Sequence, residues 1–337
     1  MVINCTSFLA DRLRLFSRLS FCRIHNYIVM LISWGVAKLS GKLFLWGYPF
    51  SLCLETASVC NLSCPECIAG IKQTRRTNKL MPFSQIADKL HIHRKNAFYC
   101  NLYAQGEPFL NSDLCSIIRL AHQNRYYSVV STNGHFLSHE NCVNLIASKL
   151  DRLIVSLDGT DPESYAKYRK GGNFDIVVEG LKRLTSLKRK TRSRRPLVVV
   201  QFLVHKANEH QLKSAPSFIR SLGADVLQFK SMQVYSQQGR FELTPDNPRY
   251  NRHLKPMNYK LSAHSNACFR VWSQAVYNSD GWLVPCCFDK IPQYPMGIVE
   301  KKRGDLWRSP QFQAFRTKIL DDPGSISICK NCIYSAI

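Results

Sequence analysis

The chain has 337 residues, 45% of them apolar, which is enough for one large domain or two medium ones with a sizeable core. Its 46 Lys and Arg residues outnumber 23 Asp and Glu, and the net charge of +23 would attract nucleic acid, acidic lipid or an anionic substrate. No uninterrupted run of 18 or more apolar residues is present, which argues against a membrane-spanning helix.

Residues 1–48 form the first predicted unit, a helical extension. The opening residues mix acid with base and lack a long apolar stretch and a cleavage site, so we expect a cytoplasmic protein. Leu and Phe alternate with Arg in this unit, and the segment 27–39 predicts a packed helix. We expect the extension to pack on the domain that follows. A helix lying on an acidic membrane surface is the alternative.

Alternating strand and helix patterns fill residues 49–232. The β-rich runs predict strands at 50–57, 98–104, 127–132, 152–158, 197–204 and 226–232. Helical patterns lie between them at 83–94, 112–124, 139–150, 174–189 and 209–222. Pro216 is expected to kink the last helix and Gly223 to cap it. Strands without strict alternation, separated by helices, predict an α/β fold with a parallel sheet, either a barrel or a doubly wound sheet.

The densest basic run, residues 182–196, ends the fourth of these helices. It contains no interleaved aromatic residues, so base stacking is not predicted. Such runs are usually solvated helix ends and loops. After it and the last strand, residues 233–267 are polar and proline-rich and predict a linker, and residues 268–337 predict a small module that carries cysteines.

The cysteines are the strongest chemical signal. The cytosol keeps thiols reduced, so fourteen cysteines in such a chain indicate metal or iron–sulfur ligation for the clustered ones rather than disulfides. "CNLSCPEC" places Cys60, Cys64 and Cys67 on the loop after the first strand, whereas a structural zinc site would need a fourth ligand nearby. Three thiolates can hold three irons of a cubane and leave the fourth iron open to a substrate or cofactor.

This C-x3-C-x2-C pattern after the first strand resembles the signature of the radical S-adenosylmethionine (SAM) superfamily. The resemblance implies a partial (β/α)6 barrel over 49–232, a [4Fe-4S] cluster on these three cysteines and S-adenosyl-L-methionine on the open iron. Reductive cleavage of that cofactor would give a radical that abstracts a substrate hydrogen. Glu66 departs from the family, which usually has an aromatic residue before the third cysteine.

Further motifs follow the next strands in the family's order. The residues similar to the motif that binds the methionine amino group are Gly106, Glu107 and Pro108, although an ordinary turn would explain this tripeptide alone. "STNG" supplies Ser131, Thr132 and Asn133, and the fourth strand is followed by a segment with Ser156 and Asp158. The resemblance implies that these residues contact the cofactor or the substrate.

The C-terminal cysteines resemble the SPASM and shortened twitch domains that hold auxiliary clusters in this superfamily. Their expected role is to bind one auxiliary [4Fe-4S] cluster through Cys268, Cys286, Cys329 and Cys332. On spacing alone, zinc held by four cysteines is the alternative. Cys287, next to a predicted ligand, is either a buried apolar residue or a donor of a hydrogen atom, and Asp289 is a candidate proton acceptor.

The leading hypothesis is a radical SAM oxidoreductase that oxidises or crosslinks a peptide side chain or oxidises a sugar-like alcohol. The alternative is a redox-neutral peptide epimerase that uses Cys287, and the alternative of another class is a basic nucleic-acid-binding protein with structural zinc. We expect a low-potential electron donor such as flavodoxin or ferredoxin as a partner, with peripheral contact to an acidic membrane as a further option. Nucleic acid is not the favoured partner.

Overall fold

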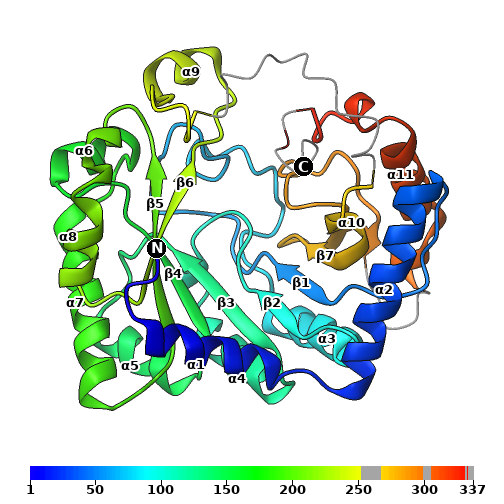
Figure 1. Cartoon of the computed structure of the whole chain (residues 1–337), viewed down its shortest axis with the longest axis horizontal. Helices are drawn as coiled ribbons and strands as arrows, with labels where there is room; N and C mark the ends of the chain where they lie inside the picture. The colour runs from blue at the N-terminus through cyan, green and yellow to red at the C-terminus, as the bar shows by residue number, and fades with distance from the viewer. Residues whose placement is uncertain (252–266, 299–304, 331, 333–337) are drawn as a thin grey trace.

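The computed structural model describes residues 1–251, 267–298, 305–330 and 332, and its main feature is one mixed sheet (Figure 1). Six strands match the predicted runs: β1 Ser51–Leu54, β2 Tyr99–Asn101, β3 Tyr127–Thr132, β4 Arg152–Ser156, β5 Leu197–Val204 and β6 Val226–Ser231. Each pairs in parallel with the next in chain order. The expected α/β fold, a partial (β/α)6 barrel whose parallel sheet does not close, is therefore confirmed.

The C-terminal module extends this same sheet at β1. β7 Gln274–Tyr277 pairs in parallel with β1, and the antiparallel strands β8 Trp282–Val284 and β9 Gly297–Ile298 follow outward, giving the order β6-β5-β4-β3-β2-β1-β7-β8-β9. The remaining elements of the module are α10 Arg270–Ser273, η3 Leu306–Arg308, α11 Pro310–Asp321 and η4 Pro323–Ser325. The module thus continues the backbone hydrogen bonding of the preceding domain.

Helices cover the outer face of the parallel strands. They are α3 Phe83–His93, α4 Leu114–Gln123, α5 His139–Ala147, α6 Pro162–Tyr168, α7 Phe174–Lys190 and α8 Ala215–Ser221, with the short turns η1 Pro108–Leu110 and η2 Glu209–Leu212. Their buried side chains join those of the strands in one apolar core. α6 was not among the predicted elements. Asp161 begins it by accepting a hydrogen bond from the backbone N–H of Ser164 at 2.8 Å.

The segment predicted as a single kinked helix at 209–222 is two pieces. Pro216 lies in the first turn of α8, where a residue without an N–H is tolerated, so the chain begins a new helix there. Gly223 follows the last turn with φ of +78°, as a cap requires. In the predicted linker, residues Gln237–Leu243 form the short helix α9, and 252–266 lie outside the described residues.

The N-terminal extension forms two helices, α1 Cys5–Phe16 and α2 Phe21–Ser40. α1 contacts β5 and hydrogen-bonds the starts of β3 and β4, and α2 contacts α10, so the extension packs on the domain as expected. In the part of the chain that is described, no helix is both long and apolar enough to cross a bilayer. The domain boundaries and the cellular location stay predictions.

Candidate active site

The three-cysteine loop connects β1 to α3 and is anchored at both of its ends. The backbone N–H of Ser58 donates to the carbonyl of Lys79 at 2.8 Å, and Met81 donates to Thr56 at 3.1 Å. Inside the loop, Cys67 donates its backbone N–H to the carbonyl of Cys64 at 3.2 Å. The base of the loop is therefore closed, and the cysteines lie beyond the carboxyl end of a central strand, where parallel α/β folds place their chemistry.

The thiols of this loop are partly or largely buried, and the Cys67 thiol contributes to the raised pKa values of Cys60 and Cys64. Burial raises the pKa of Cys64 to about 11, and the nearby Arg169 opposes that rise. Burial also raises the pKa of Cys60, while its sulfur accepts the N–H of Leu62 at 3.4 Å. Among the described residues no three Cys, His, Asp or Glu side chains are gathered around a point where one metal ion would fit. A cubane differs, because each thiolate binds a separate iron.

Glu107 ties the second predicted motif to the third. Its carboxylate, 1% exposed, accepts the hydroxyl of Thr132 at 2.8 Å and the backbone N–H groups of Asn133 at 2.8 Å and Phe109 at 3.1 Å. Burial raises the pKa of Glu107, and these donors oppose the rise. Asn133 in turn reaches the cysteine loop, because its amide lies 3.7 Å from the sulfur of Cys60. The motifs that follow three successive strands thus meet at one place.

Gly106 allows the close approach on which this meeting depends. It has φ of +70°, and a Cβ atom there would lie 2.5 Å from the carbonyl oxygen of Ala57 and 2.6 Å from that of Val59. The next residue, Glu107, donates its N–H to Val59 at 2.8 Å. Only glycine combines this backbone conformation with the absence of a side chain, so the Gly-Glu-Pro turn is packed directly on the strand end that leads to Cys60.

Asp158 faces a partner that the sequence did not reveal. Its fully buried carboxylate accepts Nε of Arg169 at 2.5 Å and the backbone N–H of Leu203 at 2.7 Å. The charge of Arg169 opposes the rise in the pKa of Cys64 in the cysteine loop. The ion pair between Asp158 and Arg169 therefore links the end of the fourth strand to that loop. Ser156 is buried in β4 beside it. No pattern around Arg169 distinguishes it from a surface arginine, and only the folded chain identifies it.

Glu66, the residue that departs from the family pattern, holds a segment from far along the chain. Its carboxylate accepts the backbone N–H of Tyr235 at 2.7 Å and of Ser236 at 3.3 Å, and it also accepts the Ser236 hydroxyl. Ser236 begins α9. Glu66 therefore fastens the cysteine loop to the segment after β6 in place of an aromatic contact.

The four C-terminal cysteines come together from three parts of the module. Burial raises the pKa of Cys268, and the Cys332 thiol adds to the rise. Burial likewise raises the pKa of Cys329 to about 12, with Cys268 and Cys332 contributing. The neighbouring thiol of Cys287, burial and the Cys268 thiol together raise the pKa of Cys286. In the described part of the chain, thiols separated by 18 and 43 residues thus lie near enough to shift one another's pKa, although they do not meet at a point where one metal ion would fit.

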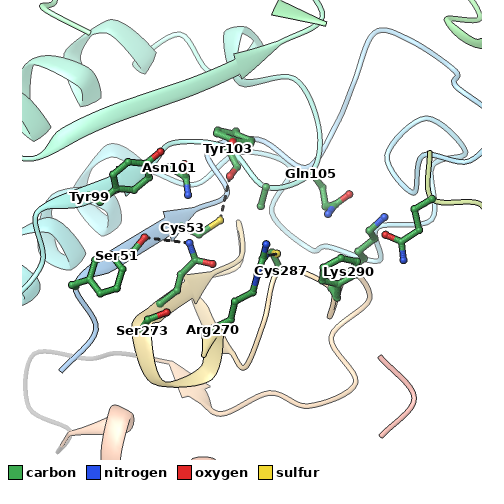
Figure 2. A pocket seen from close by; sticks show the side chains of 15 residues that line it. Ser51, Cys53, Tyr99, Asn101, Tyr103, Gln105, Arg270, Ser273, Cys287 and Lys290 are labelled. Atoms are coloured by element: carbon green, nitrogen blue, oxygen red, sulfur yellow. Dashed lines mark hydrogen bonds between the residues drawn. The ribbon is translucent and has the colours of Figure 1, made fainter. Parts of the chain in front are cut away.

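Cys287 lines the hollow inner side of the sheet (Figure 2). A cavity of about 580 Å³ lies there, and Ser51, Cys53, Tyr99, Asn101, Arg270 and Lys290 are among the residues around it. Arg270 donates Nη1 to the sulfur of Cys287 at 2.8 Å. The hydrogen bond with Cys286, followed by the charges of Arg270 and Lys290, lowers the pKa of Cys287. A second hollow of about 690 Å³, beside β6, shares Arg270 and Cys287 with the first.

Asp289 is placed differently from Cys287. It is 2% exposed, and its carboxylate accepts the backbone N–H groups of Gln293 at 2.8 Å and Tyr294 at 3.0 Å. Burial raises the pKa of Asp289. Its described contacts hold a turn, whereas the thiol of Cys287 borders the space that a substrate could enter.

Two family profiles match the chain. One, described as "Radical SAM superfamily", covers residues 54–215, and the other, described as "SPASM: Iron-sulfur cluster-binding domain", covers residues 268–333. The first spans the three-cysteine loop and the motifs after the next three strands. The second begins at Cys268 and includes the other C-terminal cysteines. The resemblance inferred from the motifs is therefore confirmed.

Curated relatives and solved structures agree with these profiles. The mycofactocin maturase MftC of Mycolicibacterium smegmatis is 31% identical over 41% of this chain and 35% of its own length. A probable GTP 3′,8-cyclase of Methanococcus maripaludis is 28% identical over 57% of this chain and 63% of its own. The chain therefore spans less than two thirds of these relatives.

Among solved structures, Streptococcus suis SuiB superposes with a TM-score of 0.60 at 14% identity, over 81% of this chain and 68% of its own. SuiB has also been solved bound to S-adenosylmethionine and bound to its precursor peptide SuiA. At this identity the likeness concerns the fold.

Proposed function

The chain carries a radical SAM domain followed by a SPASM iron–sulfur domain, and from this premise we propose that it oxidises or crosslinks a peptide side chain or oxidises a sugar-like alcohol. The substrate would lose a hydrogen atom, then a proton and an electron, and the electron would pass to an auxiliary cluster. The observation that carries the proposal is the position of the C-terminal cysteines. Cys286 is one of them, and its neighbour Cys287 lines the cavity of about 580 Å³.

The three-cysteine loop fits the radical-generating [4Fe-4S] cluster by its donor chemistry. Cys60 and Cys64 each have their pKa raised in part by the neighbouring thiols, and Leu62 and Asn133 direct N–H groups at the sulfur of Cys60 that oppose the rise in its pKa. With S-adenosyl-L-methionine bound, this cluster would supply the radical that removes hydrogen from substrate. The cofactor would lie against Gly106, Glu107 and Pro108, and the negative charge of Glu107 would hold its ammonium group.

The third and fourth strands would complete the cofactor site. Ser131 and Thr132 end β3, Asn133 follows it beside Glu107, and Ser156 ends β4. Asp158 would act through Arg169, because its carboxylate is already paired with that guanidinium. The contribution of Asp158 would then be to fix the position of the cysteine loop.

The auxiliary [4Fe-4S] cluster would be held by Cys268, Cys286, Cys329 and Cys332. Four protein ligands leave no open iron, so this cluster suits electron transfer rather than substrate binding. Arg270, Lys290, Lys230 and Arg249 border the two hollows, which favours a substrate with an anionic group. A low-potential donor such as flavodoxin or ferredoxin would reduce the enzyme. SuiB, whose fold this chain shares, binds a precursor peptide, which supports a peptide as the substrate.

Redox-neutral epimerisation is the second candidate, and the exposure of Cys287 to the cavity favours it. In that reaction the thiol would return a hydrogen atom to the substrate radical. The hydrogen bond that Arg270 donates to the sulfur of Cys287 favours a thiolate, which has no hydrogen atom to give, so this contact supports oxidation more strongly. Asp289 would accept the proton in an oxidation only if the turn that it holds opened.

The test is reductive cleavage of S-adenosyl-L-methionine by the anaerobically reconstituted protein with dithionite, followed as 5′-deoxyadenosine by chromatography. We expect cleavage in the parent chain and none in Cys64→Ala. Cys115→Ala, which changes a half-buried cysteine on α4, is the matched control and should retain cleavage. Cleavage that persists in Cys64→Ala would exclude the assigned ligand set.

A further inference from the structure

The N-terminal helix α1 turns its polar side inward. Asp11 is 1% exposed, and its carboxylate pairs with Arg14 at 3.1 Å and with Arg152 at 2.5 Å, and it also accepts the hydroxyl of Tyr127. Tyr127 and Arg152 are the first residues of β3 and β4. α1 is thus fastened across the amino ends of two strands by charge and hydrogen bonds.

The start of α2 is fastened in the same way. Arg23 is buried and donates to the carbonyl oxygens of Arg125 at 2.7 Å and Arg94 at 2.8 Å. Asn26, also buried, accepts the N–H of Tyr48 at 2.8 Å and donates to its carbonyl at 3.1 Å. The inner contacts of α1 and of the start of α2 are therefore largely polar, whereas further along α2 Met30 and Ala37 join the apolar core.

Apolar side chains occupy the opposite side of both helices. Their spacing of three or four residues places them on one face of each helix. They are between 44% and 90% exposed, and they are Leu9, Leu13, Phe16, Phe21, Ile24, Ile28, Ile32 and Leu39. A surface helix of a globular protein normally shows the reverse arrangement, with its apolar stripe on the core. This reversal in α1 and at the start of α2, together with the apolar residues on both sides of the rest of α2, indicates that the outer face meets an apolar environment.

Basic loops surround this face. The segments before β2, β3, β4 and β5 carry exposed Arg94, Lys95, Arg125, Lys149, Arg192 and Arg194. They contact the helices directly, because Arg125 donates to the carbonyl of Ser17 at 3.0 Å and Arg14 donates to that of Arg194 at 3.2 Å. A groove of about 510 Å³ lies between Leu13 of α1 and Lys149, Arg194 and neighbouring residues. Part of the basic run at 182–196 therefore adjoins the apolar helix face.

We propose that the outer faces of α1 and α2, with these basic loops, bind the surface of an anionic lipid bilayer. The apolar side chains would enter the boundary between headgroups and acyl chains, and the basic residues would contact the phosphates. Because the loops precede the strands, α1 and the basic loops lie at the opposite end of the parallel strands from the cysteine loop, and α2 leaves this end along the side of the molecule that carries α10 (Figure 1). The catalytic end would remain open to substrate.

The charge favours lipid over a second copy of the chain. A two-fold contact through this face would bring the same exposed arginines and lysines of both copies together, and each copy has a net charge of +23. An anionic bilayer instead offers an apolar layer for the exposed apolar side chains and negative charge for the basic residues. It satisfies both features with one partner.

The test is co-sedimentation of the full chain with vesicles of equimolar phosphatidylglycerol and phosphatidylcholine, compared with vesicles of phosphatidylcholine alone. Leu13→Ser combined with Phe16→Ser should weaken binding to the anionic vesicles about tenfold or more. The matched control combines Val143→Ser with Ile176→Ser, which are similarly exposed on α5 and α7, and it should bind as the parent does.

A second pair of variants tests the charge. Arg192→Gln with Arg194→Gln should weaken binding to anionic vesicles about tenfold and reduce its salt dependence, whereas Lys167→Gln with Lys213→Gln, on segments that follow strands, should not. Absence of binding by the parent chain, or equal binding by parent and apolar variant, would overturn the proposal. So would a dimer of the parent in gel filtration that the apolar variant converts to monomer without any effect on vesicles.

Discussion

Among the single residues of the candidate site, Glu107 makes the most connections. Its carboxylate receives three hydrogen bonds from two motifs and lies next to the turn that packs on the cysteine loop. A buried carboxylate with its donors on one side can still present negative charge to a cationic ligand on the other. Glu107 therefore joins the geometry of the site to its electrostatics.

Glu107→Gln should weaken the binding of S-adenosyl-L-methionine by about tenfold to a hundredfold, because a hydrogen bond to a charged group contributes about 1.5–3 kcal/mol. The new amide would also direct N–H groups at one of the present donors. Binding would be measured by equilibrium dialysis at matched iron content. Glu163→Gln, on an exposed carboxylate of α6, is the control, and equal affinities in both variants would contradict the assignment.

At the scale of elements, Glu66 is the contact that connects α9 to the cysteine loop. Glu66→Ala removes three hydrogen bonds to Tyr235 and Ser236 and should lower the free energy of unfolding by about 1–3 kcal/mol. Amide hydrogen exchange at 235–239 should become faster. Glu242→Ala, on an exposed residue of the same helix, should leave that exchange unchanged.

Helix α3 and strand β7 are joined by a buried histidine. Nε2 of His93 lies 2.9 Å from the hydroxyl of Tyr277, and burial, with a smaller effect of Lys89, lowers the pKa of His93 to about 4. The unfolded chain binds a proton at this residue from about pH 6.5 downward, while the folded chain does not until about pH 4. Its contribution to stability is therefore present at neutral pH and is lost as the pH falls through that window.

The expected loss of stability from His93 alone is about 2 kcal/mol between pH 7 and pH 5. Urea unfolding of the parent and of His93→Gln at these two pH values would measure it as the difference between their pH dependences. His91→Gln, on an exposed histidine of the same helix, should retain the parent's dependence. Identical slopes for the parent and His93→Gln would exclude a buried neutral His93.

Across the whole molecule, the features that could be predicted from the sequence are those that depend on a short stretch of chain, such as single strands and closely spaced cysteines. The six strands β1 to β6 were found, because each is a short β-rich run between helical segments. The motif cysteines could be recognised because their spacing is local. The pairing of β7 with β1 could not, since Gln274 and its partner Ser51 are far apart in the chain and neither strand carries a signal for the other.

Arg169, Arg270 and the inner side of α1 could not be predicted either, because their roles depend on residues that only the folded chain brings beside them. Arg169 and Arg270 resemble the many surface arginines of a basic chain, and only their burial beside Asp158 and Cys287 identifies them. The polar inner side of α1 was also hidden, because an amphipathic pattern does not tell which side faces the protein. Long-range contacts, rather than propensity, decided each of these features.

The most direct test of the central claim, that the molecule holds two clusters, is iron and acid-labile sulfide per chain after anaerobic reconstitution, with zinc measured in parallel. We expect about eight irons per chain, falling to about four when Cys268 and Cys286 are both replaced by alanine. About four irons and one zinc in the parent chain would contradict the claim of two clusters, because the C-terminal cysteines would then hold a structural metal that cannot accept an electron.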